Sequence, residues 1–386
     1  MTALLLTGGR VCAAEGLLEP GWLRISAGRI DSLGPGTPPP AAAGERVVDA
    51  AGHVVLPGFI DLHVHGGAGC DAMDADEDGL RRMARFHAAH GVTAILHTTW
   101  AASEEAIRAA LEAVAAVAGP VAGGATILGA HLEGPWINPG RGGAQDPSGI
   151  RPPDAAEARR LLDAGPVRLV ALAPELDGAA AVVAECRRRG VTVAAGHTDA
   201  GYEQMAAAVG WGVRHVTHTF NAMGGFGHRE PGTVGAALAF PELRCELIAD
   251  GVHVHPAAMA VLARAKGPGG VILVSDATRA AGLPEGPVDL GGRTGHHCGG
   301  AVRLADGRLA GSALTLDVAL RRFAAASGWG WDRLWRAVAG NAADALGLTA
   351  KGRLAPGADA DVVLLDGAGE VRLTVAGGDV VAGSLP

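Results

Sequence analysis

Residues 58–66 read GFIDLHVHG, a short apolar run that ends in polar side chains. Side chains two positions apart in a strand point to the same face, so we expect His63 and His65 to point the same way. Two imidazoles on one face can bind a single ion, although two ordinary buried histidines give the same pattern. The run therefore predicts a buried strand with a candidate metal site at its C-terminal end.

Seven further apolar runs follow this one, separated by Ala-, Arg- and Glu-rich segments with a helical pattern. The runs lie at residues 92–97, 126–131, 169–173, 192–195, 215–218, 246–249 and 271–274. The helical segments lie at residues 78–89, 104–117, 154–162, 179–189 and 204–209. Buried strands that alternate with helices are typical of an α/β fold with a parallel sheet. The pattern predicts a (β/α)8 barrel of the TIM type over residues 54–350.

The two ends of the chain have a different pattern, in which Gly and Pro punctuate short runs of strand-forming residues. These runs lie at residues 3–6, 22–26, 29–32 and 46–49, and again at 362–365, 371–375 and 379–381. We expect residues 1–53 and 351–386 to form one small β-sandwich domain together, beside the barrel.

The composition excludes several classes of protein. Net charge is −8 and apolar residues make up 48% of the 386 residues, which argues against a nucleic-acid binder driven by bulk charge. We find no run of roughly 20 uninterrupted apolar residues, the length that a membrane span needs. The five cysteines form no C-x-x-C pair and no disulfide framework, so we expect a reducing, cytoplasmic setting.

Polar side chains end several of the other predicted strands. Glu133, His197, His218 and Asp276 each lie where an apolar run stops. In a barrel the C-terminal ends of the strands face the active site, so these side chains should meet at one mouth. Buried polar groups are costly without a partner, and a divalent cation is a partner that all of them can share. Imidazole and carboxylate ligands suit zinc or iron(II) better than magnesium or calcium.

Several longer motifs carry a resemblance to a known family. The run PGFIDLHVHG (57–66) resembles the amidohydrolase superfamily. The motifs that follow resemble, nearly end to end, its N-acetylglucosamine-6-phosphate deacetylase family: HLEGPWINP (131–139), AGHTDAGYEQM (195–205), HTFNAM (218–223), HREPG (228–232), ADGVHVHP (249–256), VSDATRAAG (274–282) and LAGSALTLD (309–317). The tail KGRLAPGADADVVLLD (351–366) resembles the returning β segment of the superfamily, which is less specific.

The resemblance implies a metal centre and a catalytic residue. Glu133, His197 and His218 would hold the ion that all active members of the family contain. His63 and His65 would add a second ion, with Glu133 as the bridge, so we expect one or two divalent ions per chain. Asp276 would be the catalytic acid and base.

The resemblance also implies a substrate site, formed by Ala144, Gln145, Asn221, Ala222, Arg229, His253 and the turn Leu309, Ala310 and Gly311. Some relatives have histidine at the position of Gln145, where it acts on the acetyl carbonyl. Glutamine can donate a hydrogen bond but cannot ionise, so the group that stabilises the oxyanion stays open.

Arg229 suits a phosphate, because a guanidinium matches phosphate oxygens in geometry and charge. A surface ion pair with Glu230 is the alternative. In the family this arginine reaches across the interface of a homodimer, so we expect a dimer in which it serves the neighbouring site.

The expected activity is hydrolysis of the N-acetyl group of N-acetylglucosamine 6-phosphate to glucosamine 6-phosphate and acetate. The alternatives are a deacetylase of the galactosamine epimer and a purine or adenosine-type deaminase of the same superfamily. A cyclic-amide hydrolase of the dihydroorotase type is disfavoured, because the predicted fourth strand has no lysine to bridge two metals. A non-catalytic barrel is disfavoured because every expected ligand is present.

Overall fold

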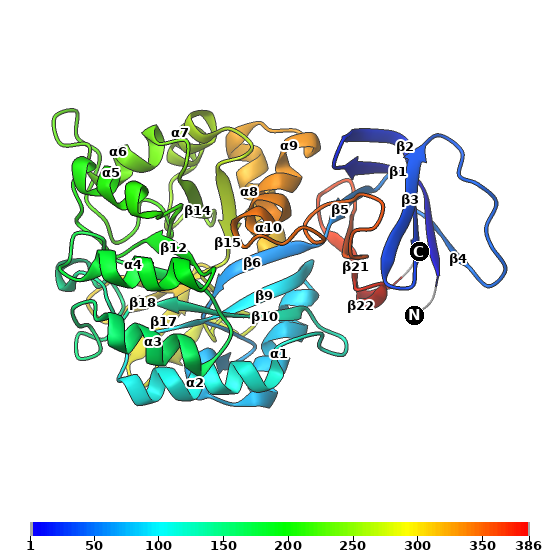
Figure 1. The fold of residues 1–386 in the computed structure, drawn as a ribbon. Helices are drawn as coiled ribbons and strands as arrows, with labels where there is room; N and C mark the ends of the chain where they lie inside the picture. The colour runs from blue at the N-terminus through cyan, green and yellow to red at the C-terminus, as the bar shows by residue number, and fades with distance from the viewer. Residues whose placement is uncertain (1–2, 385–386) are drawn as a thin grey trace.

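The structure is a computed structural model that describes residues 3–384. A large α/β part and a smaller β part lie side by side, and both ends of the chain lie in the smaller part (Figure 1). The predicted barrel with a small β domain built from both termini is confirmed.

Eight parallel strands form the barrel in the order in which they occur along the chain. They are β6 (Phe59–Val64), β9 (Val92–Thr99), β10 (Thr126–Glu133), β11 (Val167–Leu172), β12 (Thr192–Ala195), β13 (His215–Val216), β14 (Arg244–Ile248) and β15 (Val271–Val274). The ring closes between the last strand and the first, where the main-chain N of Asp276 donates to the carbonyl of His63 at 2.9 Å. Val64 also forms a parallel bridge with Ala277 there.

Helices connect the strands, and they lie around the outside of the strands (Figure 1). They are α1 (Glu77–Ala88), α2 (Glu104–Val117), α3 (Ala155–Ala164), α4 (Ala179–Arg188), α5 (Tyr202–Trp211), α6 (Gly232–Ala239), α7 (Pro256–Lys266), α8 (Leu316–Ser327), α9 (Trp331–Trp335) and α10 (Asn341–Ala345). Asp76, Ser103 and Asp154 cap the first three helices by accepting hydrogen bonds from free main-chain N–H groups, which fixes where these helices begin. The helices predicted from the sequence are therefore confirmed within a few residues.

A four-stranded antiparallel sheet follows β15. It consists of β16 (Gly286–Asp289), β17 (Thr294–Cys298), β18 (Ala301–Leu304) and β19 (Leu309–Ser312). Ser312 forms a parallel bridge with Ala277, three residues after the end of β15. This pairing brings residues 309–311 to the end of the eighth strand, where the substrate site was expected.

The terminal domain contains β1 (Leu4–Ala13), β2 (Gly16–Ser26), β3 (Arg29–Pro35), β4 (Arg46–Asp49), β5 (Val54–Pro57), β20 (Val362–Leu365), β21 (Val371–Ala376) and β22 (Asp379–Gly383). β5 lies between β1 and β20, so it joins the N-terminal strands to the C-terminal ones. Residues 54–57 fall in the range expected for the barrel, but they pair within the terminal sheet. The sheet has its own core, which includes Leu23, Ile25 and Val362.

Within residues 3–384, we find no helix whose length and apolar character would let it cross a bilayer.

Candidate metal centre and substrate cavity

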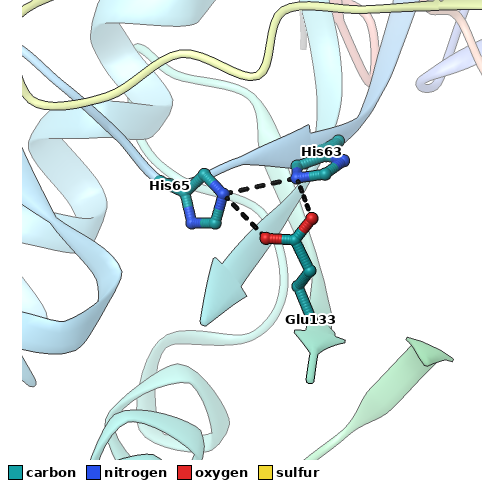
Figure 2. Close-up of side chains that lie close together, drawn as sticks. All are labelled: His63, His65 and Glu133. Atoms are coloured by element: carbon teal, nitrogen blue, oxygen red, sulfur yellow. Dashed lines mark hydrogen bonds and ion pairs between the residues drawn. The ribbon is translucent and has the colours of Figure 1, made fainter. Parts of the chain in front are cut away.

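Glu133, the last residue of β10, lies at the centre of the site and is 1% exposed. The Nε2 atoms of four histidines surround its carboxylate. Oε1 lies 3.3 Å from His63, 3.2 Å from His197 and 3.1 Å from His218. Oε2 lies 3.3 Å from His65. Figure 2 shows His63 and His65 each turning a ring nitrogen toward the carboxylate.

The ligand-type atoms form two clusters that could each hold a metal ion. One cluster contains His63, His65 and Glu133, and the other contains Glu133, His197 and His218. Glu133 belongs to both, so its carboxylate lies where a bridge between two ions would lie. The structure thus brings together all five residues that the sequence predicted as metal ligands.

The hydrogen-bond partners of His63 and His197 indicate which ring nitrogen faces the centre. Nδ1 of His63 lies 3.0 Å from a carboxylate oxygen of Glu246, and Nδ1 of His197 lies 2.8 Å from the main-chain carbonyl of Arg141. Because these oxygens only accept hydrogen bonds, the neutral form of each ring would carry its proton on Nδ1 and turn the lone pair of Nε2 to the centre.

The Nε2 atoms of the four histidines also lie close to one another in pairs. The Nε2 atoms of His197 and His218 are 3.0 Å apart, and those of His63 and His65 are 3.3 Å apart. At this distance a proton or a metal ion between the two nitrogens of each pair would remove the repulsion of their lone pairs. Imidazole nitrogens with a shared carboxylate are a donor set typical of zinc and iron, so the residues fit a divalent cation.

Buried carboxylates dominate the electrostatics of the centre. Burial lowers the pKa of His65, but Asp276 and Glu133 overcome this and raise it to about 9. Burial would raise the pKa of Glu133, but the imidazoles of His63 and His197 hold it well below its usual range. The site therefore favours positive charge at its centre, as a proton or as a metal ion.

Several residues of the site have the left-handed backbone conformation, which is uncommon outside glycine. φ is 47° at His197, 27° at His218, 51° at Ala222 and 48° at Asp276. The sixth strand was predicted to span residues 215–218, but β13 ends at Val216 because the chain turns at His218. Such strain is often concentrated at functional sites, where it directs a side chain that a regular strand would point elsewhere.

Asp276 lies two residues after the end of β15 and faces the same centre. Its Oδ1 is 3.5 Å from Nε2 of His63 and 3.4 Å from Nε2 of His65. The residue is 6% exposed, and it lines the cavity described next. Its position allows it to contact both the ligand cluster and a molecule in the cavity.

A cavity of about 220 Å³ opens over the metal ligands. Most of the predicted substrate residues line it: Ala144, Gln145, Asn221, Ala222, His253, Leu309 and Gly311. Ala310, the remaining residue of the predicted turn, does not line it, because its side chain is buried beside Ala280, Val288 and Val302. Arg229 is exposed on the loop before α6 and does not line the cavity of its own chain.

Two of the lining residues have further contacts. Gln145 donates to Oε2 of Glu133 at 2.6 Å, and it accepts from the main-chain N of Ala101 at 2.7 Å. Its amide therefore supports the central carboxylate as well as facing the cavity. His253 is held by Asp250, which lies 2.6 Å from its Nδ1 and 2.7 Å from its main-chain N.

Some residues of the site were not singled out from the sequence. Trp100, directly after β9, stacks on His65 with ring centroids 3.7 Å apart and lines the cavity. Arg308 lines the cavity and donates to the carbonyl of Gly143 at 2.8 Å. Glu246 does not line the cavity, but it contacts the ring of His63 from the side away from Glu133. The available signal for it was a single acidic residue inside an apolar run.

Comparisons with known proteins show which family the chain resembles. Residues 54–381 match the family model described as the amidohydrolase family. The chain is 36% identical over 386 residues to N-acetylglucosamine-6-phosphate deacetylase of Bacillus subtilis (strain 168). This alignment covers 98% of this chain and 97% of the relative. It is 38% identical over 368 residues to N-acetylgalactosamine-6-phosphate deacetylase of Escherichia coli O157:H7, and this alignment covers 94% of this chain and 95% of the relative.

Among solved structures, a similar one is the mutant N-acetyl-D-glucosamine-6-phosphate deacetylase of Mycobacterium smegmatis in complex with N-acetyl-D-glucosamine 6-phosphate. It has a TM-score of 0.93 and 37% sequence identity, and the match covers 99% of this chain and 100% of that chain. The likeness thus includes both the barrel and the terminal domain.

Proposed function

Because the chain belongs to the amidohydrolase family, we propose that it hydrolyses the N-acetyl group of N-acetylglucosamine 6-phosphate to glucosamine 6-phosphate and acetate. One observation carries this proposal. The cavity that Asp276 lines is also lined by Glu133, which the two ligand clusters share, and by their histidines His65, His197 and His218. The near-full-length relative from Bacillus subtilis carries the name of this deacetylase.

We assign the metal ligands from the two clusters. Glu133, His197 and His218 would hold one divalent ion, and His63 and His65 would hold a second with Glu133 between them. Zinc or iron suits these donors. A bound ion would supply a water that ionises near neutral pH and would polarise the carbonyl of the substrate.

Asp276 moves the proton in this scheme. Amide hydrolysis takes a proton from the attacking water and needs one on the departing nitrogen, because a free amide anion is a poor leaving group. A carboxylate that faces both the ligand cluster and the cavity can accept the first proton and donate it again to the nitrogen. Asp276 is the residue we assign to this general base and general acid role.

The phosphate of the substrate needs a cation, and we assign it to Arg229 of a second copy of the chain. Arg229 is exposed and does not line its own cavity. Phe226, three residues earlier, is 63% exposed, so its ring is accessible to a second chain. A homodimer that covers Phe226 and delivers Arg229 to the neighbouring cavity accounts for both.

The alternatives considered from the sequence are not favoured. The solved complex from Mycobacterium smegmatis contains the glucosamine epimer, and none of the relatives described above is named a deaminase.

The five cysteines form no disulfide, and we place the enzyme in the cytoplasm on the ground that reduced cysteines fit that compartment.

Acetate release tests the proposed reaction. We would compare N-acetylglucosamine 6-phosphate, N-acetylgalactosamine 6-phosphate and both unphosphorylated sugars, and we expect the highest kcat/KM for the first. A higher kcat/KM for N-acetylgalactosamine 6-phosphate would mean that the galactosamine epimer, and not the glucosamine epimer, is the substrate. If the protein releases ammonia from adenosine but no acetate from any of the sugars, the proposed deacetylase is wrong and the protein is a deaminase.

A further inference from the structure

Glu246 on β14 is a buried acid that does not touch the cavity. The side chain is 0% exposed, and it lies in the apolar run RCELI of the seventh strand. Burying an ionised carboxylate is costly unless several donors surround it. The identity of these donors therefore indicates what the residue does.

The donors of Glu246 come from two parts of the site. One oxygen lies 2.9 Å from Nε2 of His215. The other lies 3.0 Å from Nδ1 of His63 and accepts from the main-chain N of His218 at 3.1 Å. The carbonyl of Glu246 also accepts from the main-chain N of Thr219 at 2.9 Å. A single residue thus contacts a histidine of one ligand cluster and the backbone of the other.

The contact with His63 selects the tautomer of its ring. A carboxylate only accepts, so the proton of the neutral ring stays on Nδ1, and Nε2 keeps its lone pair toward Glu133, 3.3 Å away. His65 has no such support: its Nδ1 has no hydrogen-bond partner, and the ring is held by stacking on Trp100.

The contacts with His218 and Thr219 hold the turn that delivers the other cluster. His218 has φ of 27°, a conformation that needs support from its surroundings. Two oxygens of Glu246 accept from consecutive main-chain N–H groups of this turn. The same residue therefore restrains His218 as well as the ring of His63.

We infer that Glu246 is a positioning residue for both metal sites: it sets the ring of His63 for the second cation and fixes the turn that carries His218. The inference rests on the metal centre assigned above, but not on the identity of the sugar. The competing explanation is that Glu246 only pairs with His215 and so stabilises the barrel interior. In that case its contacts with His63 and His218 would have no effect on metal binding.

Calorimetric titration of metal-free protein with Zn²⁺ tests this role without any substrate. Glu246→Gln keeps the size of the side chain but leaves only one acceptor oxygen. Groups that support metal ligands typically contribute roughly 10–100-fold to metal affinity, so we expect a loss of about 10-fold or more at the site that contains His63. Glu246→Asp, which keeps the charge but is too short to reach both clusters, should lose affinity at one or both sites.

Glu157→Gln is the matched control, because Glu157 is also a buried acid and accepts a hydrogen bond from Trp136 at 2.8 Å, away from the cavity. It should bind Zn²⁺ as the wild type does. Wild-type stoichiometry and affinity in both Glu246 variants would overturn the inference. Failure of both variants to fold would also count against it, because the role would then be in barrel stability.

The outcome is independent of the reaction. A wild type that binds two ions but releases no acetate would reject the proposed function and leave the role of Glu246 standing. A wild type that binds two ions and releases acetate, with Glu246 variants that bind normally, would reject only the inference.

Discussion

The two halves of the metal centre share Glu133 but are built in different ways. His63 lies in β6 and His65 directly follows its last residue, Val64, and the two histidines are 0% and 1% exposed. His197 and His218 follow two different strands, both in the left-handed conformation, and are each 5% exposed. One half is a product of strand alternation, and the other is a product of turns.

This difference explains how each half is held. The alternation of a strand places two side chains on one face without strain, so the His63 half needs only contacts that orient its rings, from Glu246 and Trp100. The His197 half needs contacts that hold its backbone, such as the hydrogen bond from Thr198 N to the carbonyl of Ala222 at 3.1 Å. The second half lines the cavity through both of its histidines. We therefore expect it to be the half on which turnover depends.

Loss of Glu133 should have the largest effect, because it breaks both halves at once. In Glu133→Ala, we expect activity at background level and loss of both ions, measured by acetate release and elemental analysis. Glu157→Gln should behave as the wild type. If Glu133→Ala retains a tightly bound ion and measurable turnover, the two halves do not depend on the shared carboxylate.

Loss of Asp276 should impair chemistry more than metal binding. Asp276→Asn keeps the size of the side chain but cannot transfer the proton, a step that contributes roughly 10²–10⁴-fold to the rate. We expect kcat to fall by that factor, with a much smaller change in KM and in metal content. Near-normal kcat would move the role of general base to another group, and His253 is the next candidate.

Removal of the His63 half should have a smaller effect than either of these changes. In a variant with both His63→Ala and His65→Ala, we expect the metal content to fall from about two ions per chain toward one. Activity should fall less than in Asp276→Asn, because the half that lines the cavity through both histidines is intact. Full metal content together with full rate would mean that this pair is structural.

Removal of Arg229 should affect substrate binding alone. Charge-assisted hydrogen bonds contribute roughly 1.5–3 kcal/mol, so KM for the 6-phosphate should rise by about one to two orders of magnitude in Arg229→Ala. The unphosphorylated sugar should be hardly affected, whereas a folding defect would slow both substrates alike.

Mixing experiments show which subunit Arg229 serves. In a mixed dimer of Arg229→Ala and Asp276→Asn chains, one of the two sites would have an intact Asp276 and an intact Arg229 from its neighbour. Some activity should therefore return. A verified mixed dimer with no recovery would place Arg229 in its own cavity or away from the substrate.

The sequence predicted the barrel because its signals are local. Each strand is a short buried run, and caps such as Ser103 and Asp154 mark where helices begin. The His63 half was predictable for the same reason, since two histidines at a spacing of two need only a strand between them. The spacing also suggested a metal site there, whereas the assignment of each ligand to a particular ion came from the resemblance to the family.

Other features depend on contacts between distant parts of the chain. Glu246 looked like the first residue of an apolar strand, and its hydrogen bond to His63 spans 183 positions. The turn that ends β13 at Val216 depends on contacts with β14, so the strand was predicted two residues too long. Ala310 was assigned to the cavity with its neighbours, but the alternation of β19 turns its side chain into a separate apolar cluster.

Reconstitution of metal-free protein tests the central claim most directly. Chelated enzyme would be titrated with Zn²⁺ or Fe²⁺ while acetate release from N-acetylglucosamine 6-phosphate is measured. We expect no turnover without metal, and a rate that rises with added ion and reaches its maximum at no more than about two ions per chain. A full rate in protein that elemental analysis shows to be free of metal would contradict the claim that the centre around Glu133 catalyses the reaction.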